Sequence, residues 1–422
     1  MKTIVAFIII FGILVFVHEF GHYYVAKKCG ILVREFSIGM GPKILAFHKN
    51  STTYTLRLLP LGGYVRMAGL DEDEGIKPGT TALIKLDSVN KISEIDLSNK
   101  VNELDGIPIQ IDKSDLVNNL YIDGYINGDD SDLKHYNVEH NANIIEPDGT
   151  SVQIAPIDVQ YQSVSAWKRI MVNFAGPFNN FILSIVAFLI FTFVNGGVTQ
   201  VNSTKIGQVE PDFPAQKAGI CSGDSIIKIN NKKVSNFNDI ANIINSNPGK
   251  NINLLIKTQN NKLKNINLKI KSVENHGKKI GLIGIVPSKK NNFITDILYA
   301  WNQMCSITIS IFSVLIGFLK GGFSLNKLAG PVGIYSMTSE AVKFGIPTLI
   351  DFTGMLSLNL GIMNLIPIPA LDGGKVLLNF IEAIRHKNIS VEKERILTIA
   401  GFVFLLILMI IVTGNDIMRY FK

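Results

Sequence analysis

Residues 18–22 of this chain read His-Glu-Phe-Gly-His, the H-E-x-x-H pattern. On a helix, positions i and i+4 lie on one face, so the imidazoles of His18 and His22 can bind a single zinc ion. Zinc lowers the pKa of a bound water to about 7, and Glu19 stands beside it as a general base. The motif therefore predicts the centre of a zinc-dependent hydrolase.

The motif lies within an apolar segment, residues 3–26. Ionisable side chains are costly in lipid, which favours a functional site over a structural pair of hydrogen-bonded histidines. A cleaved signal peptide is the other interpretation of this segment. It has no small-x-small cleavage site and it carries His18 and Glu19 near its end, so we expect an uncleaved spanning helix.

Three further apolar segments, residues 174–198, 348–368 and 396–412, are long enough to cross a hydrocarbon core of about 30 Å. A fifth stretch, residues 297–319, is apolar but interrupted by Asn, Gln, Ser and Thr. It could span the bilayer, but we favour an amphipathic helix on the membrane surface.

Basic residues predict the orientation of the chain. They follow the first segment at 27–43, precede the second at 168–169 and separate the third from the fourth at 385–395. By the positive-inside rule these flanks are cytoplasmic. The N-terminus, residues 199–345 and the C-terminus are then expected on the other side of the membrane.

Two histidines leave a zinc ion short of a third protein ligand. The end of the third apolar segment offers Asp372, which this topology places at the same depth as His18 and His22. Asp351 lies at the opposite end of the segment and fails the same test. A turn residue before two glycines is the alternative interpretation of Asp372. Because the H-E-x-x-H motif is present, we favour the ligand.

A second histidine pair, His135 and His140, resembles an inverted metal motif. Its spacing is i to i+5, which would turn the two rings about 140° apart on a helix. The stretch is polar and rich in Asp and Asn. We expect both histidines on the surface.

Composition narrows the possible partners. The 422 residues carry a net charge of +7, and 47% are apolar and gathered in blocks, which favours membrane topology as the cause of the basic balance. We find no Arg-rich patch with interleaved aromatics, so nucleic acid is not an expected partner. A disulfide framework or a thiolate metal site is not expected either, because three cysteines lie far apart without a C-x-x-C pair: Cys29, Cys221 and Cys305.

The H-E-x-x-H motif is joined by a second pattern at 364–374, Asn-Leu-Ile-Pro-Ile-Pro-Ala-Leu-Asp-Gly-Gly. Together they resemble the site-2 protease family of intramembrane zinc metalloproteases, in its bacterial branch with one PDZ domain that regulates envelope-stress sigma factors. The resemblance covers most of the chain except roughly 71–165. It extends to residues 174–180, to 326–334 and to 34–69, which looks like the family's re-entrant β-hairpin with a strand edge for an extended substrate.

The resemblance implies a role for each matching residue. His18, His22 and Asp372 would be the ligands of Zn²⁺, and Glu19 the catalytic base. Substrate binding is implied for four residues near the second pattern: Asn364, Pro367, Pro369 and, at lower weight, Asn359.

The predicted fold is a polytopic α-helical membrane protein with about four transmembrane helices, a membrane-associated β-hairpin region and an extracytoplasmic PDZ domain. The expected order is helix one (1–28), hairpin region (29–70), cytoplasmic insert (71–165), helix two (170–198), PDZ domain (200–290), surface amphipathic region (291–345), helix three (346–374), cytoplasmic segment (375–395) and helix four (396–415).

The sequence indicates possible roles for one of the two predicted soluble domains but not for the other. Residues 203–272 alternate apolar and polar and resemble a PDZ domain, with a groove helix at 239–244 and a strand at 251–257. It could be a plain spacer, bind a peptide or filter substrates by size. Residues 71–165 are polar and predict a small β-rich or mixed domain whose role the sequence does not indicate.

The expected activity is cleavage of single-span membrane proteins within the bilayer of the bacterial plasma membrane, with anti-sigma factors or signal-peptide remnants as substrates and the enzyme a monomer. One alternative is a catalytically inactive relative that acts as a PDZ scaffold, but no ligand or base is missing. The other is a transporter whose buried His and Glu relay ions. Transporters usually show repeated halves, and we find no internal repeat.

Overall fold

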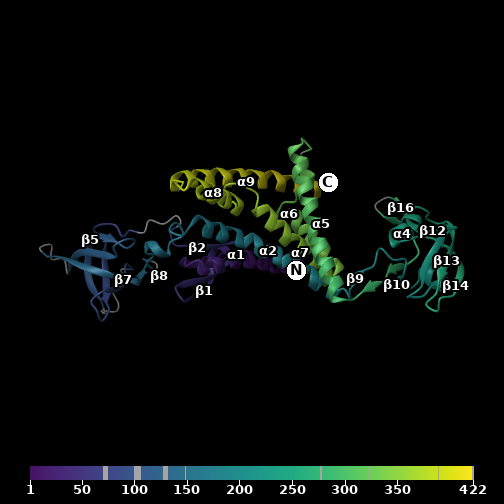
Figure 1. Ribbon diagram of the computed structural model, residues 1–422, viewed down its shortest axis with the longest axis horizontal. Coiled ribbons are helices and arrows are strands. Elements are labelled where there is room, and N and C mark those ends of the chain that lie inside the picture. Colours follow the sequence, from purple (N-terminus) through teal and green to yellow (C-terminus); the bar gives the residue numbers. More distant parts are fainter. Residues whose placement is uncertain are drawn as a thin grey trace. The chain divides into compact units, whose positions relative to one another are not determined.

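The computed structural model describes residues 1–69, 75–98, 106–126, 132–147, 149–275, 278–322, 324–387 and 389–420. The chain divides into two compact units (Figure 1), one made of residues 1–184 and 306–422 and the other of residues 185–305. The first unit holds most of the long helices, a bent β-hairpin and a small β domain. The second is a small mixed α/β domain.

The long helices are α1 (Lys2–Lys28), α2 (Ala166–Val194), α5 (Phe293–Leu319), α6 (Pro331–Phe344), α7 (Ile346–Asn364), α8 (Asp372–Arg385) and α9 (Val391–Tyr420). By length and composition, five helices of the described chain could cross a membrane: α1, α2, α5, α7 and α9. The sequence predicts about four. The difference is α5, for which the sequence favours an amphipathic surface helix at 297–319, but whose length and composition suffice for a span.

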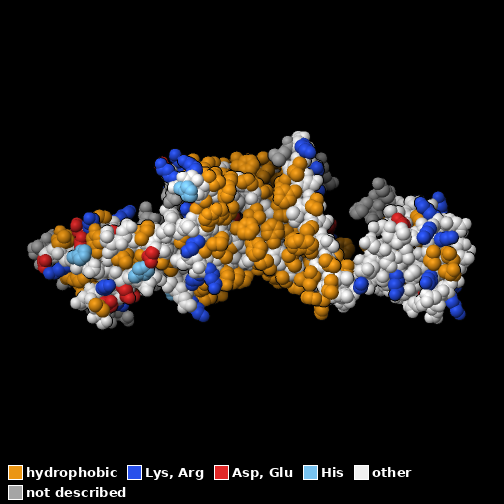
Figure 2. Space-filling model, viewed as in Figure 1, with side chains coloured by type: hydrophobic (Ala, Val, Ile, Leu, Met, Phe, Trp, Pro, Cys, Tyr) orange, Lys and Arg blue, Asp and Glu red, His pale blue; other side chains and the backbone are white. Residues whose placement is uncertain are grey.

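Large apolar side chains are exposed along these helices, as the orange surface in Figure 2 shows. On α9 they include Phe402, Phe404, Ile407 and Ile410, each at least half exposed. Continuous apolar surface of this kind is unfavourable in water and suits a hydrocarbon solvent. The long helices therefore present the surface of a membrane protein.

The predicted third helix, residues 346–374, is wrong in its last ten residues. α7 ends at Asn364, and α8 begins as a separate helix at Asp372. Proline lacks a backbone N–H and disfavours helical geometry in the residue before it, so Pro367 and Pro369 break the helix between these ends. Asp372 thus opens a new helix and does not close the preceding one.

The hairpin consists of β1 (Val33–Lys49) and β2 (Thr52–Met67), which fold back on themselves. Residues 35–38 of β1 pair on one side with 53–56 and on the other with 63–66. The two long strands therefore make a bent sheet of four short segments. Their outer edges are residues 43–49 and 63–67.

The segment between the hairpin and α2 forms β3 (Thr81–Leu86), β4 (Ile92–Asp96), β5 (Ile107–Asp115), β6 (Tyr121–Ile126), β7 (Leu133–Ile145), β8 (Ser151–Gln153) and a 3-10 turn, η1 (Ile157–Val159). Its strand order is β4-β3-β5-β6-β7-β8, and β4 also pairs with β7 in parallel. Strands β3 to β7 therefore close into a small barrel. The barrel encloses a core rich in isoleucine, including Ile84, Ile95 and Ile111. Part of the segment 71–165, for which the sequence predicts a small β-rich or mixed domain, lies outside the described residues, including 99–105.

The second unit contains β9 (Val198–Thr199), β10 (Ile206–Val209), α3 (Pro214–Lys217), β11 (Ser225–Ile229), β12 (Lys232–Lys233), α4 (Phe237–Asn245), β13 (Asn251–Lys257), β14 (Leu263–Lys269), β15 (Lys271–Asn275), β16 (Lys278–Leu282), β17 (Ile285–Pro287) and β18 (Lys289–Lys290). A sheet of order β12-β11-β13-β14 packs with α4 around buried isoleucines such as Ile226, Ile240 and Ile256. The groove helix predicted at 239–244 lies within α4, and the strand predicted at 251–257 is β13.

A buried carboxylate ties the last helix of the first unit to α6. Asp416 of α9 is 1% exposed, and its Oδ2 accepts the backbone N–H groups of Gly330 at 2.8 Å and Gly333 at 2.9 Å. These donors are the free N–H groups at the start of α6, which has no side-chain cap of its own. Asp416 therefore caps α6 from a distant part of the chain.

We expect Asp416→Ala to destabilise the protein by about 2–4 kcal/mol, because two buried N–H groups lose a charged acceptor. The measurement is the midpoint of thermal unfolding of the detergent-purified protein. Asn415→Ala is the matched control: it removes an exposed hydrogen bond to Asn326 and should change stability by less than about 0.5 kcal/mol. Equal midpoints for the two variants would contradict the capping role.

Candidate metal centre

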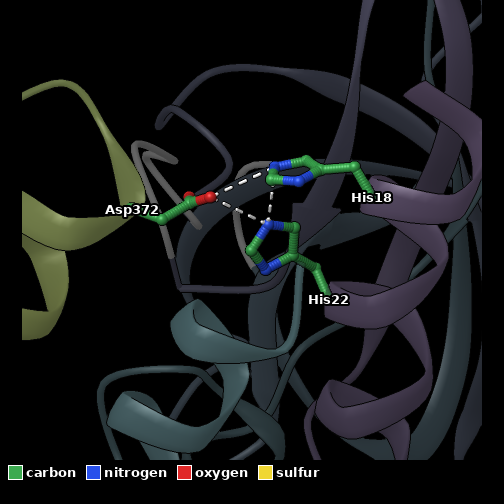
Figure 3. A group of neighbouring side chains, drawn as sticks. All are labelled: His18, His22 and Asp372. Carbon is green, nitrogen blue, oxygen red and sulfur yellow. Dashed lines mark hydrogen bonds and ion pairs between the residues drawn. The ribbon is translucent and has the colours of Figure 1, made fainter. Parts of the chain in front are cut away.

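Three possible metal ligands, His18, His22 and Asp372, converge from α1 and α8 (Figure 3). Asp372 Oδ2 lies 3.1 Å from His18 Nε2 and 3.3 Å from His22 Nε2. The two Nε2 atoms are 3.3 Å apart. Both imidazoles are buried, and the carboxylate side chain is 18% exposed. The three atoms thus form a nearly equilateral triangle at the edge of the buried interior.

This triangle has the dimensions of a zinc site. Ligand atoms about 2.0–2.1 Å from a tetrahedral ion lie about 3.3 Å from one another. The observed separations of 3.1–3.3 Å match that value. Two imidazoles and one carboxylate are also the ligand set of hydrolytic zinc sites that keep a fourth position open. The residues present therefore fit Zn²⁺.

The backbone of α2 fixes the ring of His22. Nδ1 of His22 donates to the carbonyl oxygen of Val172 at 2.8 Å. This hydrogen bond places the proton on Nδ1 and leaves the lone pair of Nε2 directed at the triangle.

The side-chain amide of Asn180 performs the same task for His18. Asn180 is fully buried, and its amide lies 3.0 Å from His18 Nδ1. With Nδ2 on that side, Oδ1 has no hydrogen-bond partner among the described residues. Turned so that Oδ1 faces the ring, the amide accepts the Nδ1–H of His18 and leaves Nε2 free for the triangle.

Glycines allow α1 and α2 to approach closely at the site. A side chain at Gly176 of α2 would overlap the ring of His22. One at Gly21 of α1 would overlap the backbone carbonyl of Ala175. A larger residue at Gly176 would therefore displace the His22 ring, and one at Gly21 would push the two helices apart.

The connection between α7 and α8 is equally tight. Any Cβ at Gly373 or Gly374 would meet the backbone carbonyls of Leu365 and Ile368. Ala370 adopts a left-handed φ of 99°, which is strained for a residue other than glycine. The loop therefore wraps closely around the first turn of α8 and presents Asp372 to the histidines.

The predicted base, Glu19, lies beside the hairpin. A Cβ at Gly63 of β2 would come within 2.9 Å of Glu19 Cγ and 2.8 Å of Val15 Cγ1. The edge of the bent sheet formed by residues 63–67 therefore lies next to this part of α1. An extended chain lying along that edge would run next to Glu19.

The predicted substrate-binding residues differ in burial and in their contact with the ligand triangle. The Nδ2 atom of Asn364, at the end of α7, lies 3.4 Å from His18 Nε2, so this amide borders the triangle. Pro369 is partly buried in the connecting loop, whereas Pro367 is exposed. Asn359 is exposed on α7 and makes no hydrogen bond to the triangle among the described contacts.

Sequence reasoning missed the partners that orient the ligands. Asn180 and Gly176 belong to a stretch, residues 174–180, noted only as a match at the start of the second helix. The carbonyl of Val172 left no sequence signal, because every residue carries one. The signal available in the sequence was the spacing of Gly176 and Asn180, a glycine and an amide four positions apart on a predicted spanning helix.

The second histidine pair, His135 and His140, lies on the surface. Both residues lie exposed on strand β7, where His135 pairs with Asp123 at 2.6 Å and His140 with Asp158 at 3.0 Å. The predicted surface position of the two histidines is therefore confirmed. All three cysteines are free.

We expect Gly176→Ala to lower zinc affinity at least tenfold, because the added methyl group displaces the His22 ring. The measurement is zinc retained by the purified protein during chelator titration. Gly12→Ala, in α1, is the matched control, since a Cβ there meets no atom within 4 Å. Equal zinc retention by the two variants would show that the close helix contact does not govern the site.

The sequence matches the model of peptidase family M50 over residues 6–408. A protein of Enterococcus faecalis named "Probable protease eep" is 48% identical over the whole of both chains. One of Lactococcus lactis named "Putative zinc metalloprotease" is 44% identical over 100% of this chain and 99% of its own.

Among solved structures, the PDZ domain of an SdrC-like protein from Listeria monocytogenes matches 20% of this chain and 85% of its own, with 21% identity and a TM-score of 0.18. A score this low does not establish a shared fold. The family of this chain is established by the family model and by the relatives that match over their full length. The chain belongs to peptidase family M50 and is a multi-pass membrane metalloprotease that uses zinc.

Proposed function

We propose that this protein hydrolyses peptide bonds inside the membrane-spanning segments of other membrane proteins. The observation that carries the proposal is the position of the ligand triangle. Two of its three corners lie within α1, a helix long and apolar enough to cross the bilayer. Ionisable residues at such depth are costly in lipid and mark a functional site.

His18, His22 and Asp372 would hold Zn²⁺, which when bound supplies a Lewis acid for water and for the substrate carbonyl. Glu19 takes a proton from the attacking water as the new C–O bond forms. It then delivers that proton to the amide nitrogen as the C–N bond breaks. The Asn364 amide, next to His18, donates a hydrogen bond to the carbonyl oxygen as negative charge develops there.

A substrate helix must unwind before this chemistry, because its amides are bonded within the helix. The hairpin edge at 63–67, which lies next to Glu19, offers replacement backbone hydrogen bonds in the manner of strand addition. Pro367 and Pro369 keep the α7–α8 loop irregular beside the scissile bond, and Asn359 borders the path of the substrate along α7.

The charge pattern of the sequence supports a site near the cytoplasmic face of the bacterial plasma membrane, with residues 200–290 on the other side. The barrel at 81–153 is then cytoplasmic. By resemblance, the substrates are single-span proteins such as anti-sigma factors, with signal-peptide remnants as a further class. The enzyme acts as a monomer.

A groove in the second unit supports peptide binding there. Its volume is about 340 Å³, and it lies between α4 and the turn from β16 to β17. Apolar side chains line it, among them Phe213, Ile240, Ile244 and Ile283. A groove between a helix and a strand is where PDZ domains add a peptide strand. A size filter for substrates with trimmed outer domains is the alternative role.

We expect Glu19→Gln to keep zinc and to lower cleavage of a single-span reporter by at least about 100-fold, because the variant cannot accept a proton. Zinc content and product formation are measured on the same preparation in lipid vesicles. A variant that cleaves at the original rate would exclude Glu19 as the base. Zinc-independent ion flux through the vesicles would favour a transporter.

We also expect a Gly-Pro pair placed in the reporter's span to speed cleavage several-fold, because it weakens the helix that must unwind. The matched control carries the same pair outside the span. Initial rates are compared with those of a span of continuous leucine. Equal rates for the leucine and Gly-Pro spans would show that unwinding does not limit the reaction.

A further inference from the structure

Five polar side chains are buried together where α2 faces α8. They come from α2, from α8 and from the segment just before α2, and we call them the docking cluster: Tyr161, Arg169, Asn173, Asn379 and Glu382. Each is 5–7% exposed. None of them belongs to the ligand triangle or to the chemistry proposed above.

The docking cluster is joined by direct contacts. Arg169 Nη1 lies 2.9 Å from Glu382 Oε2, an ion pair between α2 and α8. The Tyr161 hydroxyl accepts hydrogen bonds from Asn173 Nδ2 at 2.7 Å and from Asn379 Nδ2 at 3.1 Å. Glu382 Oε1 also accepts the backbone N–H of Ile389, just beyond α8, at 2.6 Å.

No large apolar side chain of α8 is fully buried. The buried residues of this helix are two glycines, Gly373 and Gly374, and two members of the docking cluster, Asn379 and Glu382. Leu377 and Phe380 are exposed, and the other large apolar side chains before Ile384 are only partly buried. Hydrophobic contact is non-directional, so it sets the rotation of α8 only loosely. Apart from the contacts of Asp372 with the two histidines, the directional side-chain contacts described for this helix are those of the docking cluster.

The ion pair contributes little net stability. Desolvation of two buried charges offsets most of their attraction, and Arg169 Nε has no hydrogen-bond partner among the described residues. What such a pair supplies is a defined geometry, because its atoms must meet in one arrangement or remain buried and unpaired. The docking cluster is therefore better suited to setting position than to adding stability.

The same turn of α2 orients both sides of the metal centre. Val172, whose carbonyl holds the ring of His22, lies between Arg169 and Asn173 in sequence. Asn379 and Glu382 follow Asp372 along α8 by about two and three turns, given 3.6 residues per turn. A rotation or shift of α8 against α2 would consequently move Asp372 relative to the histidines.

We propose that the docking cluster positions the third zinc ligand, by fixing α8 on α2 so that Asp372 stays within reach of His18 and His22. The inference rests on the proposed ligand role of Asp372 and extends it to residues that do not border the metal centre. The cluster members are positioning residues: they touch neither substrate nor metal. Partners that orient ligands typically raise metal affinity by about 10–100-fold.

Two variants of the full-length protein in lipid vesicles test the proposal. Arg169→Met/Glu382→Gln removes both charges together, which avoids leaving one buried alone and keeps the acceptor for the N–H of Ile389. Tyr161→Phe removes the shared hydroxyl and keeps the ring. The matched control is Lys85→Met/Glu94→Gln in the barrel, where an ion pair of the same 2.9 Å length joins side chains that are 50% and 28% exposed.

Zinc affinity is measured by competition with a chromophoric chelator, and reporter cleavage is measured over a range of free zinc. Both cluster variants should bind zinc about 10–100-fold more weakly. Added zinc should restore their cleavage to the original maximal rate, a recovery that misfolding would not allow. The control should match the unaltered protein in both measurements.

Unchanged zinc affinity in both cluster variants would overturn the proposal. So would cleavage that stays low at saturating zinc, or an equal loss of affinity in the control. Zinc affinity does not depend on cleavage, so this test fails or succeeds separately from the proposed intramembrane proteolysis.

Discussion

The structure depends on one constraint: three ligand atoms from opposite ends of the sequence must meet at about 3.3 Å from one another within an apolar helical assembly. The observed separations, 3.1–3.3 Å, satisfy it. Water cannot substitute for a misplaced ligand partner in lipid, so each polar group near the site needs a partner from the protein. Most unusual features of the first unit serve this requirement.

Close packing and polar partners meet the constraint together. Gly176 gives the His22 ring its space, and Gly373 lets the α7–α8 loop close over the helix that begins at Asp372. The carbonyl of Val172 and the amide of Asn180 turn the rings toward the third ligand. The proposed docking cluster fixes the position of α8 by polar contacts in the same way. No large apolar side chain is among the buried residues of this helix.

Much of the site was predictable from sequence, because H-E-x-x-H at helical spacing and a carboxylate at matching depth carry chemical meaning on their own. The break between Asn364 and Asp372 is predictable from Pro367 and Pro369, although the apolar run across it has the length and composition of one helix. The carbonyl of Val172 and the ion pair of Arg169 could not be predicted, since they depend on which helices become neighbours. The pairing of β4 with β7 could not be predicted either, since it depends on which strands become neighbours.

The most direct test of the account is to identify the bond that is cut. The purified protein, loaded with zinc in lipid vesicles, is given a single-span reporter, and the products are mapped by mass spectrometry. The account predicts new termini inside the membrane-spanning segment, toward its cytoplasmic end, with both products dependent on zinc. Cleavage confined to residues outside the span would contradict it, because the ligand triangle would then act on soluble segments.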